Sequence, residues 1–595
     1  MKKTLAIPPR NEYPRPQFKR REWVNLNGEW TCELDLSRSG DWRNLKDKKG
    51  FRRKIIVPFC PESKLSGIGF TDFIEMIWYH KKIDIPSKWK GKLILLHFGG
   101  VDYESTVYID GQEIGRHTGG CSPFTLEISR FVSAGKSHDL IVQARDENRN
   151  GLQPMGKQNP WYDSRGALYT RTTGIWQTVW MEAVNPRALK SCRIIPDYDN
   201  GSFTFLPEFY QDGRELNLNI SLREGRKEVA AADIAAGSHA AATVKLPSPK
   251  EWNPEKPFLY DMKLTLTDSS GAVIDEVETY GGLRKFHIEG NRFYLNNQPV
   301  FLRFVLDQGF YADGLWTAPS DRDLKRDIEL SMKAGFNGAR LHQKIFDERF
   351  HYWADKLGYL TWGEFPDWGL SFWQHFRPTN PDYQRSFRNF FAEWGAVVER
   401  DRNHPSIIAW TPLNETCNIF DLGEHRRFVS DLYDFTKRLD PTRPVHDTSG
   451  YTHAKTDIWS VHLYRLDQKS FEDHLNEEPV CMNFRKDEEN AYRGQPFVIA
   501  EYGGLRYLPE GRKPFAANSW GYNKQQVSAE ECVKQITDLT LAIVKNPRCA
   551  GYCYTQLTDI EQEENGLYFY AERTPKFDMK TIRKCFSAKP GWSRF

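Results

Sequence analysis

The feature that most constrains the fold is a change of hydrophobic periodicity near residue 283. Before it, short runs alternate apolar and polar residues between Gly, Asp and Pro, as antiparallel strands do. After it, helical segments alternate with short apolar runs. Because 595 residues exceed what one hydrophobic core holds, we expect several domains, with a long β region first and a βα region second.

The β region divides into two sandwiches. Up to residue 184 the short strands suggest an antiparallel sandwich. Within it, residues 107–114 predict a hairpin, with Asp110 and Gly111 at turn positions that need positive φ. Residues 185–282 have the length of one immunoglobulin-like β-sandwich.

Residues 283–595 predict a (β/α)8 TIM barrel. A helix over 321–334 would have Ser320 as its N-cap and Gly335 as its stop. Further helices are predicted over 349–357, 383–400, 424–439 and 529–545. Strands are predicted over 300–305, 336–341, 359–362, 407–410, 444–446, 458–462, 497–500 and 550–554. About eight β units in roughly 300 residues is the rhythm of this barrel.

Charge and cysteine content exclude several classes of protein. The net charge is +3 with acids and bases interspersed, unlike the clustered basic residues of a nucleic-acid-binding surface. No apolar run is long enough to span a membrane, and the apolar stub near the N-terminus is too short for a secretory signal. The 10 cysteines lack close metal-type pairs, so we expect reduced thiols and a cytoplasmic location.

Two glutamates directly follow apolar strands of the predicted barrel. Residues 407–415 end in Asn414-Glu415, and residues 497–501 end in Glu501. The chemistry of such barrels lies at the carboxyl ends of the strands, so both side chains are expected at one mouth. A retaining glycosidase uses two carboxyls about 5–5.5 Å apart, one protonated and one ionised. Either glutamate alone would be interpreted as a solvated loop residue, but the pair favours glycoside hydrolysis.

The segment 400–415, Arg-Asp-Arg-Asn-His-Pro-Ser-Ile-Ile-Ala-Trp-Thr-Pro-Leu-Asn-Glu, resembles the acid/base signature of glycoside hydrolase family 2. Residues 169–180, with Gly-Ile-Trp, resemble a strand of that family's first domain. The family includes β-galactosidases, β-glucuronidases and β-mannosidases. The resemblance covers nearly the whole chain and implies a jelly-roll, sugar-binding-like β-sandwich over 1–184, an immunoglobulin-like sandwich over 185–282 and a catalytic barrel over 283–595.

Carried over by position, the resemblance implies roles for individual residues. Glu415 matches the acid/base, and Glu501, in Ala-Glu-Tyr-Gly-Gly, matches the nucleophile. Asn414 matches an Asn that forms a hydrogen bond to the sugar 2-hydroxyl, and this bond strengthens in the transition state. Tyr464 matches a Tyr that orients the nucleophile, and Arg340 an Arg that keeps it ionised.

His462 lies two residues before Tyr464, so both are expected on one face of a strand. The alternatives are a core histidine for His462 and a structural ion pair for Arg340. After the second strand the family's Arg-x-Ser-His is replaced by Arg-Leu-His-Gln, so His342 is displaced by one position. After the third strand, Glu364 could be the acidic ligand of the family's metal site, but the His that completes this site in the family is absent here. No structural Mg²⁺ is therefore expected.

The loops that would select the sugar also depart from the family pattern. Glucuronidases bind the substrate carboxylate partly through Asn-x-Lys, but Asn565 here is followed by Gly-Leu. Asp307 is instead expected to bind neutral sugar hydroxyls. Trp316 and Trp368 are expected to wall the substrate site, since pyranose faces pack well on flat rings.

The sequence therefore predicts a retaining exo-acting β-glycosidase that needs no cofactor and releases a neutral, β-galactoside-like terminal sugar from oligosaccharides or glycosides. The alternatives are a β-glucuronide, β-mannoside or α-arabinopyranoside substrate, or a carbohydrate-binding protein built on an inactive barrel. The expected partner is a carbohydrate, with no nucleic acid and no membrane. Family members often form dimers or tetramers, so a homo-oligomer is compatible with the resemblance.

Overall fold

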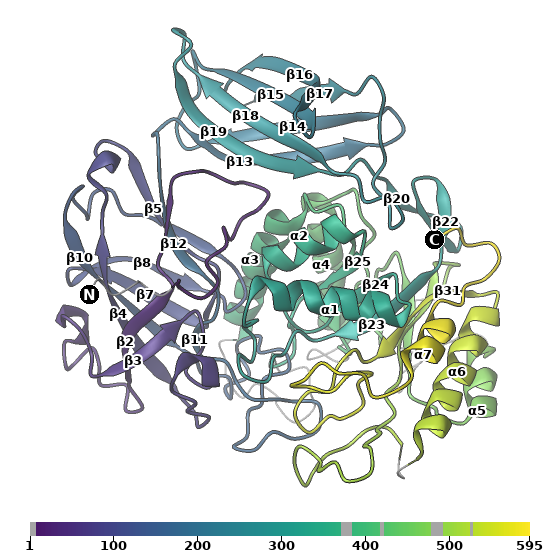
Figure 1. Ribbon diagram of the computed structural model, residues 1–595. Helices are drawn as coiled ribbons and strands as arrows, with labels where there is room; N and C mark the ends of the chain where they lie inside the picture. Colours follow the sequence, from purple (N-terminus) through teal and green to yellow (C-terminus); the bar gives the residue numbers. More distant parts are fainter. Residues whose placement is uncertain (1–6, 238, 371–382, 417–421, 478–491, 524–526) are drawn as a thin grey trace.

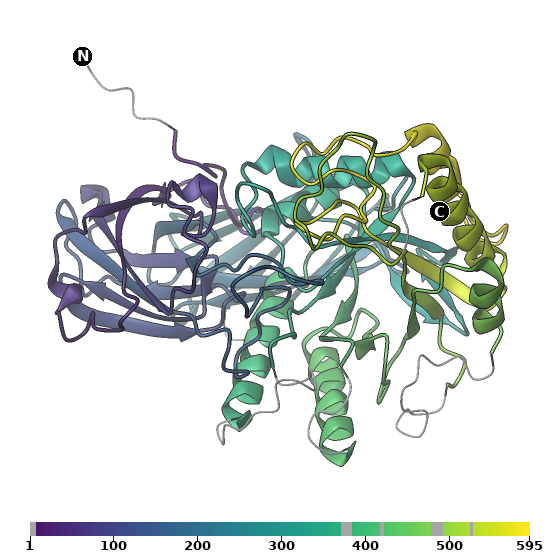
Figure 2. The ribbon, with the colours of Figure 1, turned by 90° about the horizontal axis from the view of Figure 1, so that it is seen from below.

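The computed structural model describes residues 7–237, 239–370, 383–416, 422–477, 492–523 and 527–595. Two β-sandwiches precede a curled parallel sheet ringed by helices (Figure 1), which confirms the predicted fold class. The N-terminal sheets lie beside the barrel in both ribbon views (Figure 1, Figure 2).

The N-terminal part contains two antiparallel sheets, ordered β1-β12-β5-β9 and β3-β2-β4-β10-β7-β8, and the short pair β11-β6. Its elements are β1 (Trp23–Asn25), β2 (Gly28–Leu34), η1 (Leu45–Asp47), β3 (Arg53–Val57), η2 (Lys64–Ser66), β4 (Met76–Asp84), η3 (Ser87–Trp89), β5 (Leu93–Phe98), β6 (Val101–Asp102), β7 (Glu104–Ile109), β8 (Gln112–Thr118), β9 (Phe124–Glu127), β10 (Ser137–Arg145), β11 (Gly174–Ile175) and β12 (Val179–Val184). The predicted hairpin is confirmed, because Asp110 and Gly111 join β7 to β8 with φ of 49° and 83°.

The second sandwich packs a three-stranded sheet, β13-β14-β17, on a four-stranded sheet, β16-β15-β18-β19. Its strands are β13 (Leu189–Asp197), β14 (Ser202–Phe209), β15 (Asn217–Glu224), β16 (Lys227–Ala235), β17 (Ala242–Lys245), β18 (Tyr260–Thr267) and β19 (Val273–Gly281). Along β15, Leu218, Ile220 and Leu222 are buried at every second position, as expected for a strand with one face on a core. The domain boundaries at 184 and 282 remain predictions.

The C-terminal part begins with a small antiparallel sheet, β20-β21-β22, and continues as a parallel sheet ordered β26-β25-β24-β23-β31-β30-β29. Its strands are β20 (Phe286–Glu289), β21 (Arg292–Leu295), β22 (Gln298–Val300), β23 (Leu302–Asp307), β24 (Gly338–Leu341), β25 (Leu360–Glu364), β26 (Ile407–Thr411), β27 (Leu413–Asn414), β28 (Thr448–Ser449), β29 (Trp459–Leu463), β30 (Phe497–Gly503) and β31 (Cys549–Thr555). Its helices are α1 (Asp321–Ala334), α2 (Glu348–Leu357), α3 (Tyr383–Asp401), α4 (Leu422–Leu439), α5 (Gln468–Leu475), α6 (Ala529–Lys545) and α7 (Met579–Phe586).

The helix predictions for α1 and α6 match the observed bounds, whereas the eight-residue helices α5 and α7 were not predicted. Ser320 is the N-cap residue of α1, but its hydroxyl donates to Asp323 Oδ2 at 2.6 Å and makes no capping bond to the backbone. The predicted strand 444–446 is reduced to a single bridge between Val445 and Trp410, and the short β28 follows it. Proline at 444 lacks the N–H that a ladder needs, which explains the interruption.

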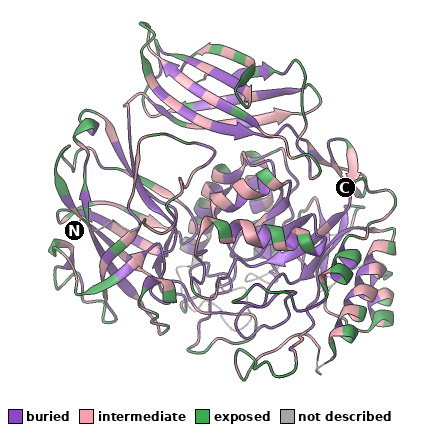
Figure 3. Ribbon diagram, in the orientation of Figure 1, coloured by how far each residue is buried: buried purple, intermediate pink, exposed green. Residues whose placement is uncertain are grey.

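Side chains on the barrel strands alternate between an interior core and a core under the helices. On β23, Phe304 and Leu306 pack inside the barrel, whereas Val305 packs outside with Ile328 of α1. The strands β24, β26 and β29 to β31 are buried throughout, and exposed residues lie on the outer helices (Figure 3). Polar side chains that point inward at the strand ends therefore start from a largely buried backbone.

The eight cysteines among the described residues are buried, and none of them is paired with another there; that they are reduced thiols remains a prediction. Within the same residues, no helix has the length and apolar character needed to cross a membrane. The cytoplasmic location remains a prediction.

Trp252 connects the second sandwich to the barrel, because it is fully buried in the barrel-interior cluster and its Nε1 donates to the Asp355 carbonyl at 2.7 Å. We expect Trp252→Ala to lower the free energy of unfolding by about 3–5 kcal/mol. Chemical denaturation monitored by circular dichroism measures it. Trp42→Ala, at a side chain that is 88% exposed, is the control and should stay within about 0.5 kcal/mol of the unchanged protein. Equal effects of the two variants would contradict this assignment.

Candidate active site

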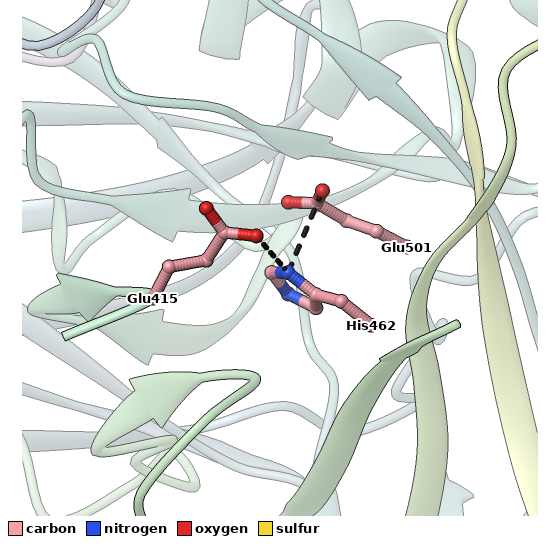
Figure 4. Close-up of side chains that lie close together, drawn as sticks. All are labelled: Glu415, His462 and Glu501. Carbon is pink, nitrogen blue, oxygen red and sulfur yellow. Dashed lines mark hydrogen bonds and ion pairs between the residues drawn. The ribbon is translucent and has the colours of Figure 1, made fainter. Parts of the chain in front are cut away.

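Two carboxylates and an imidazole meet at the carboxyl ends of the barrel strands. His462 Nδ1 lies 2.7 Å from Glu415 Oε1 and 3.5 Å from Glu501 Oε2, and all three side chains converge in Figure 4. One oxygen of Glu415 and one of Glu501 lie within 4.8 Å of each other. The structure thus brings the two predicted catalytic glutamates together.

A β-bulge turns Glu501 toward the barrel interior. In the parallel pairing of β29 with β30, Val461 is opposite Ile499, and the next pair is His462 with Glu501. Ala500 is therefore an extra residue on β30. Ile499 packs in the core under the helices, so without the bulge Glu501, two positions later, would share that outward direction.

Glu501 is surrounded by positive charge. Arg340 Nη2 donates to its Oε1 at 2.7 Å, and the Tyr464 hydroxyl donates to its Oε2 at 2.5 Å. Burial alone raises the pKa of the Glu501 carboxyl, but the charges of His462 and Arg340 outweigh burial and lower this pKa to about 2. Glu501 is therefore ionised at neutral pH, as a nucleophile must be.

Glu415 has a different setting. Its side chain is 15% exposed, against 6% for that of Glu501. Its backbone lies in the left-handed region, with φ of 52°, and its N–H donates to the Ser449 carbonyl at 2.9 Å. Such a conformation is uncommon for a residue with a Cβ and persists where surrounding contacts hold it. The strand-end pair β27-β28 thus fixes the direction of the Glu415 side chain.

Arg340 links four strand ends. Its fully buried guanidinium donates to Glu364 Oε2 at 2.6 Å, to the Ala500 carbonyl at 2.8 Å and to Asn414 Oδ1 at 2.7 Å, besides its bond to Glu501. Burial lowers the pKa of Arg340, but Glu364 and Glu501 raise it more, so the guanidinium stays charged.

His342 lies inside the same network. Its Nδ1 is 2.8 Å from Arg340 Nη2 and 2.8 Å from Glu364 Oε1. Burial, together with the charge of Arg340, holds its pKa well below the ordinary value, so the ring is neutral. Glu364, which the family pattern would offer to a metal, is occupied by this arginine and histidine.

Asn414 carries a free donor into the site. Its Oδ1 is bound by Arg340, whereas its buried Nδ2 has no hydrogen-bond partner among the described residues. Its backbone is held on both sides, because its N–H donates to Asp367 Oδ1 at 3.1 Å and its carbonyl accepts from Trp368 Nε1 at 3.1 Å. The amide group is thus presented to a ligand in a fixed orientation.

Two predicted residues lie elsewhere. Asp307 lies two residues after Val305 on β23, so both side chains point to the same side of the strand, and Val305 faces the helices. Its Oδ1 accepts from the Gly309 N–H, and burial followed by the charge of Asp327 raises its pKa to about 7. Trp316 is 2% exposed and packs against Trp176 at 5.1 Å between ring centroids. It packs in the hydrophobic core between the N-terminal part and the barrel.

Three site residues were not predicted. Lys157 comes from the N-terminal part, and its Nζ lies 3.6 Å above the centroid of the Trp368 ring. Tyr522 stacks on Tyr464 with 3.6 Å between centroids. Glu563, buried, accepts from the Tyr169 hydroxyl and acts electrostatically on both Lys157 and Glu501. No spacing signal connects these residues to the catalytic pair, because they come from distant segments of the chain.

A metal ion could be held by only one group of residues in the part of the chain that the structure describes, namely Glu415, His462 and Glu501. An ion there would occupy both carboxylates. Within this group, His462 Nδ1 lies at hydrogen-bonding distance from Glu415 Oε1.

Comparison with known families gives three matches along the chain. Residues 70–149 match the model described as glycosyl hydrolases family 2, sugar binding domain, and residues 210–284 match that of glycosyl hydrolases family 2. Residues 286–589, about half of the chain, match glycosyl hydrolases family 2, TIM barrel domain.

Individual relatives are distant. A β-glucuronidase of Paenibacillus borealis is 22% identical over 81% of this chain and 83% of its own length. A β-galactosidase of Thermoanaerobacter pseudethanolicus is 26% identical over 73% of this chain. This chain spans only 56% of the length of that relative, and only 58% of the length of a Formosa agariphila relative. The crystal structure of a Ruminococcus gnavus β-glucuronidase superposes with a TM-score of 0.79 at 20% identity, covering 98% of this chain and 99% of that one. At this identity the superposition shows the fold alone.

Removing Arg340 leaves two buried carboxylates without their cation. We expect Arg340→Met to lower the free energy of unfolding by about 3–5 kcal/mol at neutral pH. Because the pKa of Glu501 is lowered to about 2, its stabilising ionisation is complete above its ordinary pKa and is lost as the pH falls toward 2. The difference between variant and unchanged protein should therefore shrink on acidification.

Urea unfolding at several pH values measures this effect. Lys534→Met breaks an exposed pair with Asp538 on α6 and serves as the control, with an expected change of about 1 kcal/mol or less. A loss for Arg340→Met that does not depend on pH would contradict the electrostatic role.

Proposed function

Because the chain belongs to glycoside hydrolase family 2, we propose that it is a retaining exo-β-glycosidase with Glu501 as nucleophile and Glu415 as acid/base. The observation that carries the proposal is the pairing of the two carboxylates around His462, with oxygens within 4.8 Å of each other. Retaining enzymes hold their carboxyls about 5–5.5 Å apart, whereas inverting enzymes leave room for a water between them.

The proposed reaction has two steps. Glu501, ionised and oriented by Arg340 and Tyr464, attacks the anomeric carbon while Glu415 donates a proton to the glycosidic oxygen. A covalent glycosyl–enzyme forms and the aglycone departs. Water, deprotonated by Glu415, then attacks the same carbon, so the sugar leaves with its original anomeric configuration.

Asn414 supports a contact with the sugar next to the reacting carbon. Its unpartnered Nδ2 would donate to the 2-hydroxyl, as the family resemblance implies, and such bonds strengthen as positive charge develops on the ring. Trp368 supports this contact, because its Nε1 holds the Asn414 carbonyl, and Lys157 Nζ covers one face of its ring.

The sugar itself is the open part of the proposal. The expectation of a neutral sugar rested on Asp307 and on the absence of lysine after Asn565. Asp307 lies outside the site, and the amide of Asn565 is bound to Glu563 and Gln556. The relatives include both β-glucuronidases and β-galactosidases, so the substrate must be identified by assay.

The roles of the two glutamates separate with activated substrates. Glu501→Ala should lower kcat for every nitrophenyl glycoside by about 10³-fold or more, because the nucleophile is lost. Glu415→Gln should lower the first step much less for these substrates, since nitrophenolate departs without a proton, but should cost about 10²–10⁴-fold for an unactivated glycoside. Glu329→Gln, on the exposed face of α1, is the control. Equal losses with both classes of substrate would contradict the acid/base assignment.

A panel of nitrophenyl glycosides at neutral pH identifies the sugar. It contains the β-galactoside, β-glucuronide, β-glucoside, β-mannoside, β-fucoside and α-arabinopyranoside. We expect turnover of at least one member, lost in Glu501→Ala, with proton NMR showing the β-anomer (the α-anomer for arabinose) as the first product. First release of the opposite anomer would exclude double displacement, and no turnover of any member would favour a binding protein.

A further inference from the structure

We infer that Lys157, supplied by the N-terminal part, binds the carboxylate of a terminal uronic acid and so determines the substrate class of this site. The inference deepens the proposed function and rests on it. It comes from the position, burial and free donors of one ammonium group beside the two carboxylates.

The backbone around Lys157 is docked firmly on the barrel loops. The Met155 N–H donates to the Trp368 carbonyl at 2.7 Å, and the Lys157 carbonyl accepts from the Tyr169 N–H at 2.7 Å. Gly156 has φ of 57°, and a Cβ there would lie 2.3 Å from the Gln343 carbonyl oxygen. Only glycine permits this close approach, and the backbone that carries Lys157 is therefore held in a fixed position.

The Lys157 side chain ends inside the site. The residue is 6% exposed, and its Nζ lies over the ring of Trp368, whose Nε1 is bound to the Asn414 carbonyl. Burial lowers the pKa of the ammonium, and the carboxylates Glu415, Glu563 and Glu501 act in the opposite direction. The ammonium therefore lies within electrostatic range of the catalytic pair and against the tryptophan that holds Asn414.

Lys157 has free donors, unlike Arg340 and Lys576. Among the described residues its ammonium has no hydrogen-bond or ion-pair partner. Arg340 is fully engaged with Glu364, Asn414, Glu501 and a carbonyl. Lys576, near the last barrel loop, is bound to Asp559 and to the Glu564 carbonyl.

A carboxylate is the ligand that this arrangement fits best. The largely buried Lys157 ammonium has three N–H donors and no acceptor among the described residues, and an anionic acceptor forms the stronger, charge-assisted bonds. Glu415, Glu501 and Glu563 would repel an acidic sugar, so a cation is required for such a substrate to enter. A neutral hydroxyl would satisfy one donor and leave the positive charge without a counterion.

The test compares matched sugar pairs: nitrophenyl β-glucuronide with β-glucoside, and β-galacturonide with β-galactoside. The measured quantity is the ratio of kcat/KM for the acid to that for its neutral partner, which cancels effects of Lys157 on the catalytic carboxylates. We expect the unchanged enzyme to favour one acid, and Lys157→Met to lower that ratio by about 10- to 100-fold. Lys157→Arg keeps the charge and should retain part of the preference, and Lys88→Met, at an exposed lysine, is the control.

Each result decides the inference. Turnover of neutral sugars only, or a ratio that Lys157→Met leaves unchanged, would overturn the role of Lys157 while leaving the proposed glycosidase intact. If no glycoside is turned over, the proposed function fails, and saturation-transfer NMR with free glucuronate, galacturonate, glucose and galactose still tests the site. Binding of a uronate that is lost in Lys157→Met would support the carboxylate site, and equal binding of acid and neutral sugars would refute it.

Discussion

The buried guanidinium of Arg340 is the interaction on which the rest of the site depends. It starts on β24 and reaches Glu364 of β25, Asn414 of β27, and both a carbonyl and the Glu501 carboxylate of β30. A buried charge of this kind is costly unless every donor is satisfied, and here the strand ends supply the acceptors. The hydrogen bonds of Arg340 connect the strand ends and also keep Glu501 ionised. A substitution of Arg340 would therefore change both the stability of the barrel and the charge of Glu501.

The site is not the property of the barrel alone. The N-terminal part supplies Lys157 above Trp368, and its Tyr169 donates to Glu563. Further away, the Tyr103 hydroxyl donates to Glu393 of α3 at 2.8 Å, a buried contact between the two parts. These contacts join the β-sandwich to the barrel and place Lys157 of the N-terminal part against Trp368, beside the proposed catalytic pair.

Much of the fold could be predicted from periodicity, because barrel strands and their helices leave strong local patterns, as at α1 and α6. Glu415 and Glu501 could be found because both follow apolar strands and lie in recognisable motifs. The direction of Glu501 could not, since it depends on the extra residue Ala500 in β30, and a bulge leaves no pattern in one sequence. Asp307 was expected in the site but lies outside it, because β23 is regular: Asp307 points to the same side as Val305, toward α1. Lys157 had no signal, because contacts between domains are not encoded in local spacing.

The different roles proposed for the two carboxylates follow from where their surroundings place positive charge and solvent. Glu501 lies deep among Arg340, His462 and the Tyr464 hydroxyl, which favour its ionised form. Glu415 is the more exposed of the two, and among the described residues its carboxylate is paired with the imidazole of His462. Two polar groups nearby, the Asn414 Nδ2 and the Lys157 ammonium, have no hydrogen-bond partner within the described residues, and leaving a fully buried group such as the Asn414 Nδ2 unsatisfied costs about 1–3 kcal/mol. A protein under selection for stability alone would replace them. Their presence beside an ionised nucleophile is explained if a substrate completes both, with a hydroxyl at Asn414 and an anionic group at Lys157.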